Sequence, residues 1–207
     1  MRQAPPRQGI PDIDLTRPFA YVASNMHRNL SDFERALPHM RSAPADEGTV
    51  RAIVVRPKTD ERAILSTGKL TPGLGLQGDN WGDSRPAEAI PTEAESSNQV
   101  SLMSSRVIAE LAVTEDRWPL AGDNLYVDFD LSSENLPPGS RIKVGTALLE
   151  ITGEPHTGCR KFSRRFGNDA VAFVNSAEGK QLNLRGIFAR VLQAGSVRVG
   201  DAIKKLT

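Results

Sequence analysis

The chain has only one cysteine and three histidines among its 207 residues, and aromatic residues make up only 5% of it. A single cysteine cannot form an intramolecular disulfide, so nothing points to an oxidising compartment. No apolar run approaches the length of a membrane span, and residues 1–7 lead into no apolar segment typical of a signal peptide. We therefore expect a cytoplasmic protein without a membrane partner.

An excess of charge of one sign is also missing. The 26 Lys and Arg residues nearly balance the 25 Asp and Glu residues, which leaves a net charge of +1. This balance gives no global electrostatic argument for nucleic acid, so no nucleic-acid partner is expected. Hydrophobic residues make up 39% of the chain, as in a globular protein, and its length allows one large domain or two small ones.

What the chain does contain is a series of short β-branched and apolar segments separated by Gly and Pro. Regular spacing of this kind predicts a mainly β protein, a barrel or a sandwich, with a few helices inserted and no tandem repeat. The segments predicted as strands are 49–56, 62–66, 99–103, 125–129, 141–144, 147–152, 184–192 and 196–199, and residues 202–206 close the chain.

Four short helices are predicted from capping residues. Ser31 and Glu34 form a capping box pattern, and the helix that follows should weaken at Pro38. Ser104 or Ser105 caps a second helix that runs to about residue 111. A third begins near Gly158, and Asn168 caps a fourth that runs through residue 175.

The only cysteine, Cys159, lies in the stretch GEPHTGCRKFSRRFG at residues 153–167, and four of the next six residues are basic. A thiol reacts as thiolate, and neighbouring cations such as Arg160 and Lys161, or a helix N-terminus, lower its pKa. The sequence therefore predicts a reactive thiol. The alternative is an inert, buried one, because free Cys is among the most buried residue types.

Two common cysteine chemistries are not favoured. His156 lies three residues before Cys159, while His27 and His39 lie in the N-terminal segment, so four ligands for a structural zinc are not at hand. A Cys/His nucleophile pair usually comes from separate segments, and His156 is too close in sequence to act as the base of a cysteine hydrolase.

A glycine-rich stretch and several arginines could bind an anion. Residues 70–83 contain four glycines whose backbone could approach a phosphate, or they could form an ordinary turn. The basic residues near Cys159 and in the segment 184–192 are either solvated charges or phosphate ligands. An arginine-ringed thiolate would suit a soft metal with an anionic cofactor.

Several stretches, taken in order, resemble the MOSC domains, the C-terminal domain type of molybdenum cofactor sulfurases. The resemblance covers roughly residues 48–206. It rests on GLGLQGDNW (73–81), QVSLM (99–103), GDNL (122–125), the Cys159 stretch, and LRGIFARV (184–191) followed by Gly195 and VGD (199–201).

The resemblance implies a closed barrel of the pyruvate kinase β-barrel type over residues 49–207, preceded by an N-terminal arm and short helix over residues 1–48. It implies that Cys159 ligates molybdenum or carries sulfane sulfur, and that molybdenum cofactor, a pterin with a phosphate tail, binds. The residues that it assigns to the cofactor pocket are Asp79, Asn124, His156, Lys161, Arg185 and Arg190. No aminotransferase-like segment is present, so pyridoxal phosphate is not expected.

The chain departs from the family pattern at some points. Many members have Pro-Arg shortly before the cysteine, where this chain has PHTG at residues 155–158. It also lacks the His-Gly-Gly segment and the C-terminal helical extension of members that reduce N-hydroxylated bases, and the N-terminal β domain of amidoxime-reducing members.

Arg185 and Arg190 pose a geometrical problem. They lie five positions apart, and an odd separation on a regular strand puts two side chains on opposite faces. Glycine inside a strand often marks a bulge, so we expect a break at Gly186. Arg185 should then lie at the barrel rim beside the glycine loop, while Arg190 faces a neighbouring strand.

Three functions are consistent with these observations. The first is a reductase of N-oxygenated small molecules, with Cys159 as metal ligand and electrons from a partner protein. The second is a carrier on which Cys159 holds a persulfide from a sulfur-donor protein, or holds a cofactor. The third is a non-enzymatic module whose basic cluster meets a nucleic acid or phosphoprotein, with Phe162 and Phe166 stacking.

Overall fold

The structure, a computed structural model, describes residues 27–83 and 97–206. Residues 1–26 of the predicted N-terminal arm lie outside the described residues. The predicted domain boundary between residues 48 and 49 stays a prediction. Among the helices that the structure describes, none is both long and apolar enough to cross a membrane.

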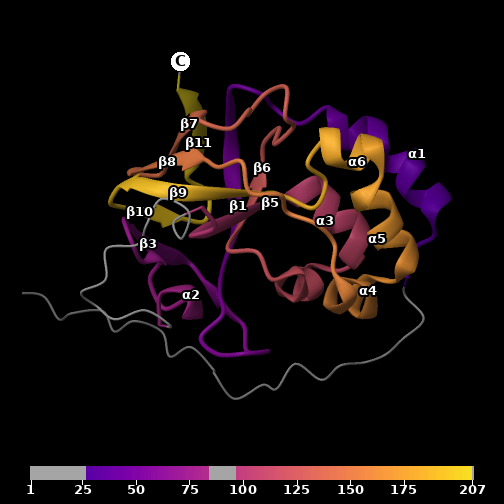
Figure 1. Ribbon diagram of the computed structural model, residues 1–207, viewed down its shortest axis with the longest axis horizontal. Helices are drawn as coiled ribbons and strands as arrows, with labels where there is room; N and C mark the ends of the chain where they lie inside the picture. Colours follow the sequence, from indigo (N-terminus) through magenta and orange to yellow (C-terminus); the bar gives the residue numbers. More distant parts are fainter. Residues whose placement is uncertain (1–26, 84–96, 207) are drawn as a thin grey trace, which may run out of the picture.

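A closed barrel of seven strands forms the centre of the molecule (Figure 1). Around the ring the order is β11, β7, β8, β9, β5, β6 and β1, and β1 pairs with β11 to close it, while β2 (Ala63–Leu65) adds to β1 outside the ring. The strands are β1 (Glu47–Val55), β5 (Val100–Ser104), β6 (Leu125–Asp128), β7 (Arg141–Val144), β8 (Ala147–Ile151), β9 (Ile187–Gln193) and β11 (Ala202–Leu206).

The barrel is mixed because β5 and β6 run parallel, while the other neighbouring strands of the ring are antiparallel. A parallel pair needs a long crossover, which here contains α3 (Ser105–Ala112) and the 3-10 helix η2 (Glu115–Ala121). Alternate residues of β8 and β9 are buried in the barrel core, as the period of two requires. The closed, mainly β barrel predicted from the sequence is confirmed.

A second, three-stranded sheet lies beside the barrel in the order β10 (Gly195–Arg198), β3 (Thr67–Thr71) and β4 (Gly75–Leu76) (Figure 1). The turn between β3 and β4 holds the first glycines of the stretch predicted to approach an anion. At Gly75, where φ is +70°, an added Cβ would lie 2.5 Å from the backbone oxygen of Gln99. This glycine therefore permits a close contact between two backbone segments, as in an ordinary packed turn.

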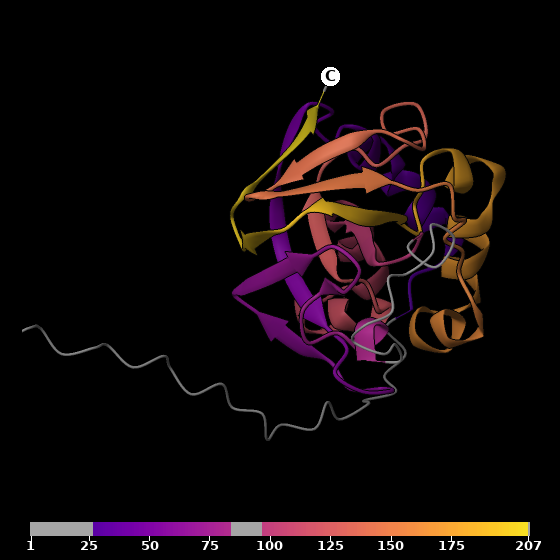
Figure 2. The same ribbon diagram turned by 60° about the vertical axis from the view of Figure 1, so that its left-hand side comes forward.

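Helices gather on one side of the barrel (Figures 1 and 2). They are α1 (Leu30–Arg41), α3, α4 (Arg160–Phe166), α5 (Asn168–Asn175) and α6 (Ala177–Gln181), while α2 (Asn80–Asp83) lies near β3. Their apolar faces form a second core against the outer barrel wall. In it, the rings of Phe33 and Phe173 stack with centroids 5.3 Å apart. This layer fixes α4, and with it Cys159, against the barrel.

The first helix begins at a different cap from the one predicted. Asn29 is its N-cap in place of Ser31: its side chain accepts from Asp32 N, and the Asp32 side chain accepts from Asn29 N. The helix, which was expected to weaken at Pro38, continues through it to Arg41. Burial of Met40 beyond the proline supplies a reason, since tertiary packing overrides local preference.

Candidate functional site

Cys159 is the N-cap residue of α4, and its side chain is exposed. The residue before it is held from α5: Gly158 N donates to Asn175 Oδ1 at 2.9 Å, and Asn175 Nδ2 donates to Gly158 O at 3.0 Å. The Asn175 carboxamide thus supplies a hydrogen-bond partner for both the backbone N–H and the backbone C=O of Gly158. The predicted helix start near Gly158 is confirmed. Because the Cys159 thiol is exposed, the alternative prediction of a buried, inert thiol is wrong.

The pKa of the Cys159 thiol is lowered from its ordinary value. Partial burial acts in the opposite direction, but the backbone N–H groups of Phe162 and Lys161 and the Arg185 guanidinium outweigh it. The direction predicted from the sequence is therefore confirmed. Of the two causes predicted, the helix start applies, since backbone N–H groups of its first turn stabilise the thiolate, and the cation that contributes is the distant Arg185.

A buried ion pair lies behind α4. Arg185 Nη1 donates to Asp123 Oδ2 at 2.7 Å, and Arg185 Nη2 donates to Ala121 O at 3.0 Å. Asp123 is fully buried and Arg185 is 7% exposed. The guanidinium carbon of Arg185 lies 4.7 Å from the ring centre of Phe162, in α4. Arg185 therefore links the barrel to the helix that carries Cys159.

His156 lies next to this pair. Its Nδ1 is 3.6 Å from Asp123 Oδ1, and its ring stacks on Phe188 with centroids 4.1 Å apart. Among the residues that the structure describes, the buried atoms Asp123 Oδ1, His156 Nδ1 and Arg185 Nε have no hydrogen-bond partner. Three such atoms from three neighbouring residues form an incompletely satisfied polar cluster, which is typical of functional sites.

The pKa of His156 is lowered to about 4. Burial is the main cause, Arg185 and Arg56 add to it, and Asp123 acts against it. At neutral pH the imidazole is therefore uncharged. The ring also lines a cavity of about 140 Å³, together with Asn183 and Gly186.

Asp79 and Asn124, both predicted from the family resemblance, meet in a second network. Asn124 Nδ2 donates to Asp79 Oδ2 at 2.8 Å. Arg56 completes the network, since its Nε and Nη2 donate to Asp79 Oδ2 and Oδ1 at 2.8 and 2.9 Å. Burial raises the pKa of Asp79, but Arg56 outweighs it and the net shift is downward. The carboxylate is therefore charged and already paired.

Arg56 and Asp123 were not predicted as site residues. The only signal for Arg56 in the sequence was its place at the end of the predicted strand 49–56. Asp123 stands in the GDNL stretch that the family resemblance used, and that position was the signal available.

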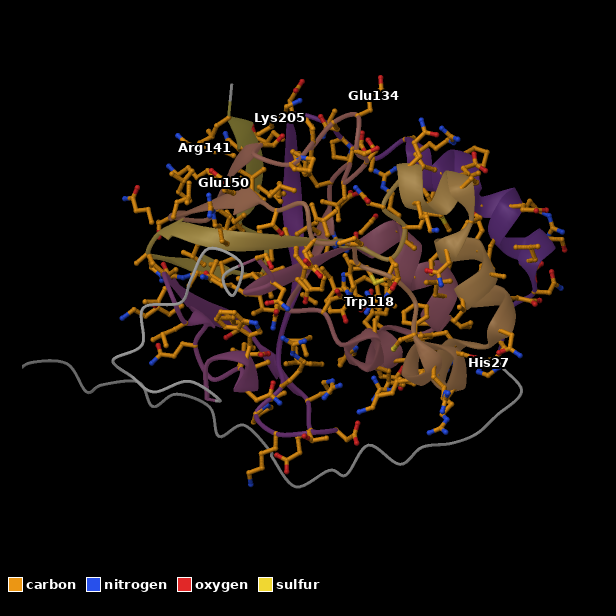
Figure 3. All side chains as sticks on the ribbon, viewed as in Figure 1. His27, Trp118, Glu134, Arg141, Glu150 and Lys205 are labelled. Atoms are coloured by element: carbon orange, nitrogen blue, oxygen red, sulfur yellow. The ribbon has the colours of Figure 1, made fainter. Side chains whose placement is uncertain are left out.

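Lys161 and Arg190 do not join the buried cluster. Lys161 is exposed, with its Nζ 3.7 Å from Asp60 Oδ1. Arg190 Nη2 donates to Glu150 Oε1 at 2.6 Å across the β8–β9 pair. In Figure 3, Glu150 lies beside Arg141 at the upper left, far from the position of α4. The assignment of Arg190 to a pocket shared with Cys159 is thus not supported by its position.

A break at Gly186 separates the two arginines, as the sequence predicted. Gly186 has φ of +103°, and β9 begins only at Ile187. An added Cβ at this position would lie 2.3 Å from Leu102 O and 3.4 Å from His156 Nδ1. Glycine therefore allows the chain to turn Arg185 inward before the regular strand carries Arg190 toward β8.

Two further expectations can be compared with the structure. Phe162 and Phe166 are buried in the helical layer, so they cannot stack on bases as the nucleic-acid hypothesis required. Within residues 27–83 and 97–206, no group of three or more His, Cys, Asp or Glu side chains could hold a metal ion.

The MOSC domain family matches residues 90–204 of the chain. Among solved structures, the YuaD protein from Bacillus subtilis is 21% identical, with a TM-score of 0.51 over 76% of this chain and 94% of that one. A hypothetical protein is 18% identical, with a TM-score of 0.52 over 82% and 71% of the two chains. YiiM from Escherichia coli is 19% identical, with a TM-score of 0.49 over 77% and 70%.

No curated protein matches the sequence. The structural similarities at these identities concern the fold, whereas the sequence match spans more than half of the chain, including Cys159, Asp123 and Arg185. The chain belongs to the MOSC domain family.

Proposed function

We propose that this protein binds molybdenum cofactor and reduces N-oxygenated small molecules, with Cys159 as the protein ligand of the metal and electrons from a partner protein. MOSC domains are associated with binding of this cofactor. The observation that carries the proposal is the exposed Cys159 thiol with its lowered pKa at the start of α4. A thiolate is the soft ligand that such a metal prefers.

The residues around Cys159 fit a bound cofactor. Asp123, His156 and Arg185 hold three buried polar atoms without partners, which a polar ligand could satisfy after a small movement of the cluster. Arg185 supports the charge of the thiolate. Bound molybdenum would supply the redox chemistry, while the chain orients the cofactor and the substrate.

His156 has a distinct role in this proposal. It is neutral at pH 7, since its pKa is about 4, so its ring can accept a hydrogen bond from a ligand without placing a second cation beside Arg185. His156 lines the cavity of about 140 Å³, which is large enough to hold a small polar group of a ligand. Asp79 and Asn124 act further away, by fixing Arg56 and the start of β5.

A second function is favoured by the exposure of the thiol. A carrier that accepts sulfur from a donor protein must present its cysteine at the surface, and Cys159 is exposed. In this alternative Cys159 holds a persulfide or a cofactor for delivery and catalyses no reaction of its own. Pyridoxal phosphate has no role in either function.

Metal and sulfur analysis separates the two functions. Protein from a molybdenum-replete host should contain molybdenum in about a one-to-one ratio if the reductase proposal holds. Labile sulfane sulfur without metal supports the carrier instead. Cys159→Ser should lose either group, whereas Thr157→Ala, an exposed position in the same loop, should retain it. A Cys159→Ser variant with full molybdenum content would overturn both.

A further inference from the structure

Four arginines from different parts of the chain converge on one short backbone segment, residues 119–122, which comprises the last three residues of η2 and the Gly122 that follows them. Each donates a hydrogen bond to a different carbonyl of that segment. The pairs are Arg62 with Pro119 at 3.2 Å, Arg165 with Leu120 at 2.8 Å, Arg185 with Ala121 at 3.0 Å, and Arg56 with Gly122 at 3.0 Å.

Two of these arginines are neutralised by buried carboxylates. Arg56 is paired with Asp79, and Arg185 with Asp123. Both carboxylates are almost completely buried. The positive charges of these two guanidinium groups are therefore already balanced.

The other two arginines are different. Arg165 Nη2 is 3.2 Å from Asp60 Oδ1, and the same oxygen is 3.7 Å from Lys161 Nζ. In the described residues, no carboxylate lies within 4.0 Å of Arg62, and its Nη2 has no hydrogen-bond acceptor. Burial lowers the pKa of Arg62, and Arg165 and Arg56 lower it further. Positive charge is therefore in excess on this side of the segment.

Asp60 is a weak partner for these cations. It is a non-glycine residue with φ of +62°, and its side chain is 63% exposed. One exposed carboxylate in a strained turn faces Arg165 and Lys161, with Arg62 close by. The Asp60 carboxylate thus lies where an anion would bind, and Arg62, Arg165 and Lys161 could bind a more highly charged anion there more tightly.

We infer that Arg62, Arg165 and Lys161 form an oxyanion site that binds a phosphate group, either free phosphate or a phosphate monoester. Among the described residues Arg62 Nη2 has no acceptor, and the Lys161 side chain is exposed, so both groups can donate charge-assisted hydrogen bonds to a phosphate. The site comprises the turn before β2 and the first two turns of α4, so a bound phosphate would link the barrel to the helix that begins after Cys159. The inference goes beyond the proposed function, because it depends on neither the thiol nor a metal.

The probe is inorganic phosphate, titrated calorimetrically into the full-length protein at low ionic strength. Arg62→Ala should weaken phosphate binding at least about tenfold, because a charge-assisted hydrogen bond is lost. Asp60→Asn should strengthen binding several-fold, since it removes the competing carboxylate. The matched control is Arg141→Ala, which removes an exposed arginine at the far end of the barrel (Figure 3) and should leave binding unchanged.

Equal phosphate affinity in Arg62→Ala, Arg141→Ala and the unaltered protein would overturn the inference. Weaker binding in Asp60→Asn would overturn it too, and this variant stays informative if Arg62→Ala does not fold. Cys159→Ser should bind phosphate normally, which separates this site from the proposed metal function. The titration is repeated on protein loaded with cofactor. If the loaded protein no longer binds added phosphate, the phosphate group of the cofactor occupies the site. If it still binds phosphate, the natural ligand is free phosphate or another monoester.

Discussion

Arg185 and Asp123, which lie 62 positions apart in the sequence, form a buried ion pair with a distance of 2.7 Å between Nη1 and Oδ2. The pair closes the polar cluster behind Cys159. Asp123 comes from the segment before β6, and Arg185 from the segment before β9, so the pair also ties together two crossings of the barrel. Its integrity should decide both the stability of the domain and the environment of the thiol.

Removal of one partner should be costly. Asp123→Ala leaves the Arg185 guanidinium buried without its carboxylate, and we expect the free energy of unfolding to fall by about 3–5 kcal/mol. Chemical denaturation would measure this. The control is Glu178→Ala, which breaks the half-exposed pair with Arg41 and should cost less than about 1 kcal/mol. Similar losses of unfolding free energy in the two variants would show that the buried Asp123–Arg185 pair contributes no more to stability than the half-exposed Glu178–Arg41 pair.

The uncharged state of His156 should appear in the pH dependence of stability. Its pKa is about 4 in the folded protein against 6.5 for an unperturbed histidine, so the unfolded chain binds more protons between these values. Stability should therefore fall as pH falls through this window, by about 2 kcal/mol from pH 7 to pH 5 for this residue alone. In His156→Gln that part of the slope should disappear. An unchanged slope in the variant would mean that His156 titrates normally.

The cause of the lowered thiol pKa can be tested on the only cysteine. The rate of alkylation against pH should have its midpoint below the free value of about 8.5. Because the helix N–H groups, and not the neighbouring side chain, stabilise the thiolate, Lys161→Ala should leave that midpoint nearly unchanged. A shift back to the free value in Lys161→Ala would instead assign the effect to the lysine charge.

Gly186 should tolerate no side chain. Gly186→Ala combines a positive φ with a Cβ placed 2.3 Å from Leu102 O, so we expect a loss of about 3 kcal/mol or more in the free energy of unfolding. Gly139→Ala provides the matched control, because φ there is +89° and nothing lies within 4 Å of the added Cβ. It should cost only the backbone strain, about 1–2 kcal/mol. Equal losses would mean that the contact with Leu102 relaxes freely.

The position of Arg190 leads to one more expectation. It pairs with Glu150 between β8 and β9, and both lie away from α4. Arg190→Ala should therefore leave the molybdenum content of purified protein unchanged, while Arg185→Ala lowers it, because a charge-assisted hydrogen bond worth about 1.5–3 kcal/mol is removed beside the thiol. Loss of metal in folded Arg190→Ala would restore that arginine to the site.

Much of the local structure could be predicted from the sequence. The predicted strand 141–144 coincides with β7, and the predicted strand 196–199 overlaps β10. Gly186 marked the break before β9, and the stretch around Cys159 marked the start of α4. These features depend on residues close together in the chain: side-chain period, β-branching, glycine freedom and capping. By contrast, Ser31 was mistaken for the N-cap because Asn29, two residues earlier, offers an equally good capping box.

The sequence by itself therefore determined the strand pattern, the single thiol and its place at a helix start, because each follows from local preferences. Only the tertiary structure decided that Arg185 faces Asp123 while Arg190 faces Glu150, and that Arg62 and Arg165 share one backbone segment. Partners separated by 40 to 62 positions leave no local signal. Which arginine is neutralised and which keeps capacity for an anion depends on barrel closure and helix packing, which bring distant charges to within a few ångströms of each other.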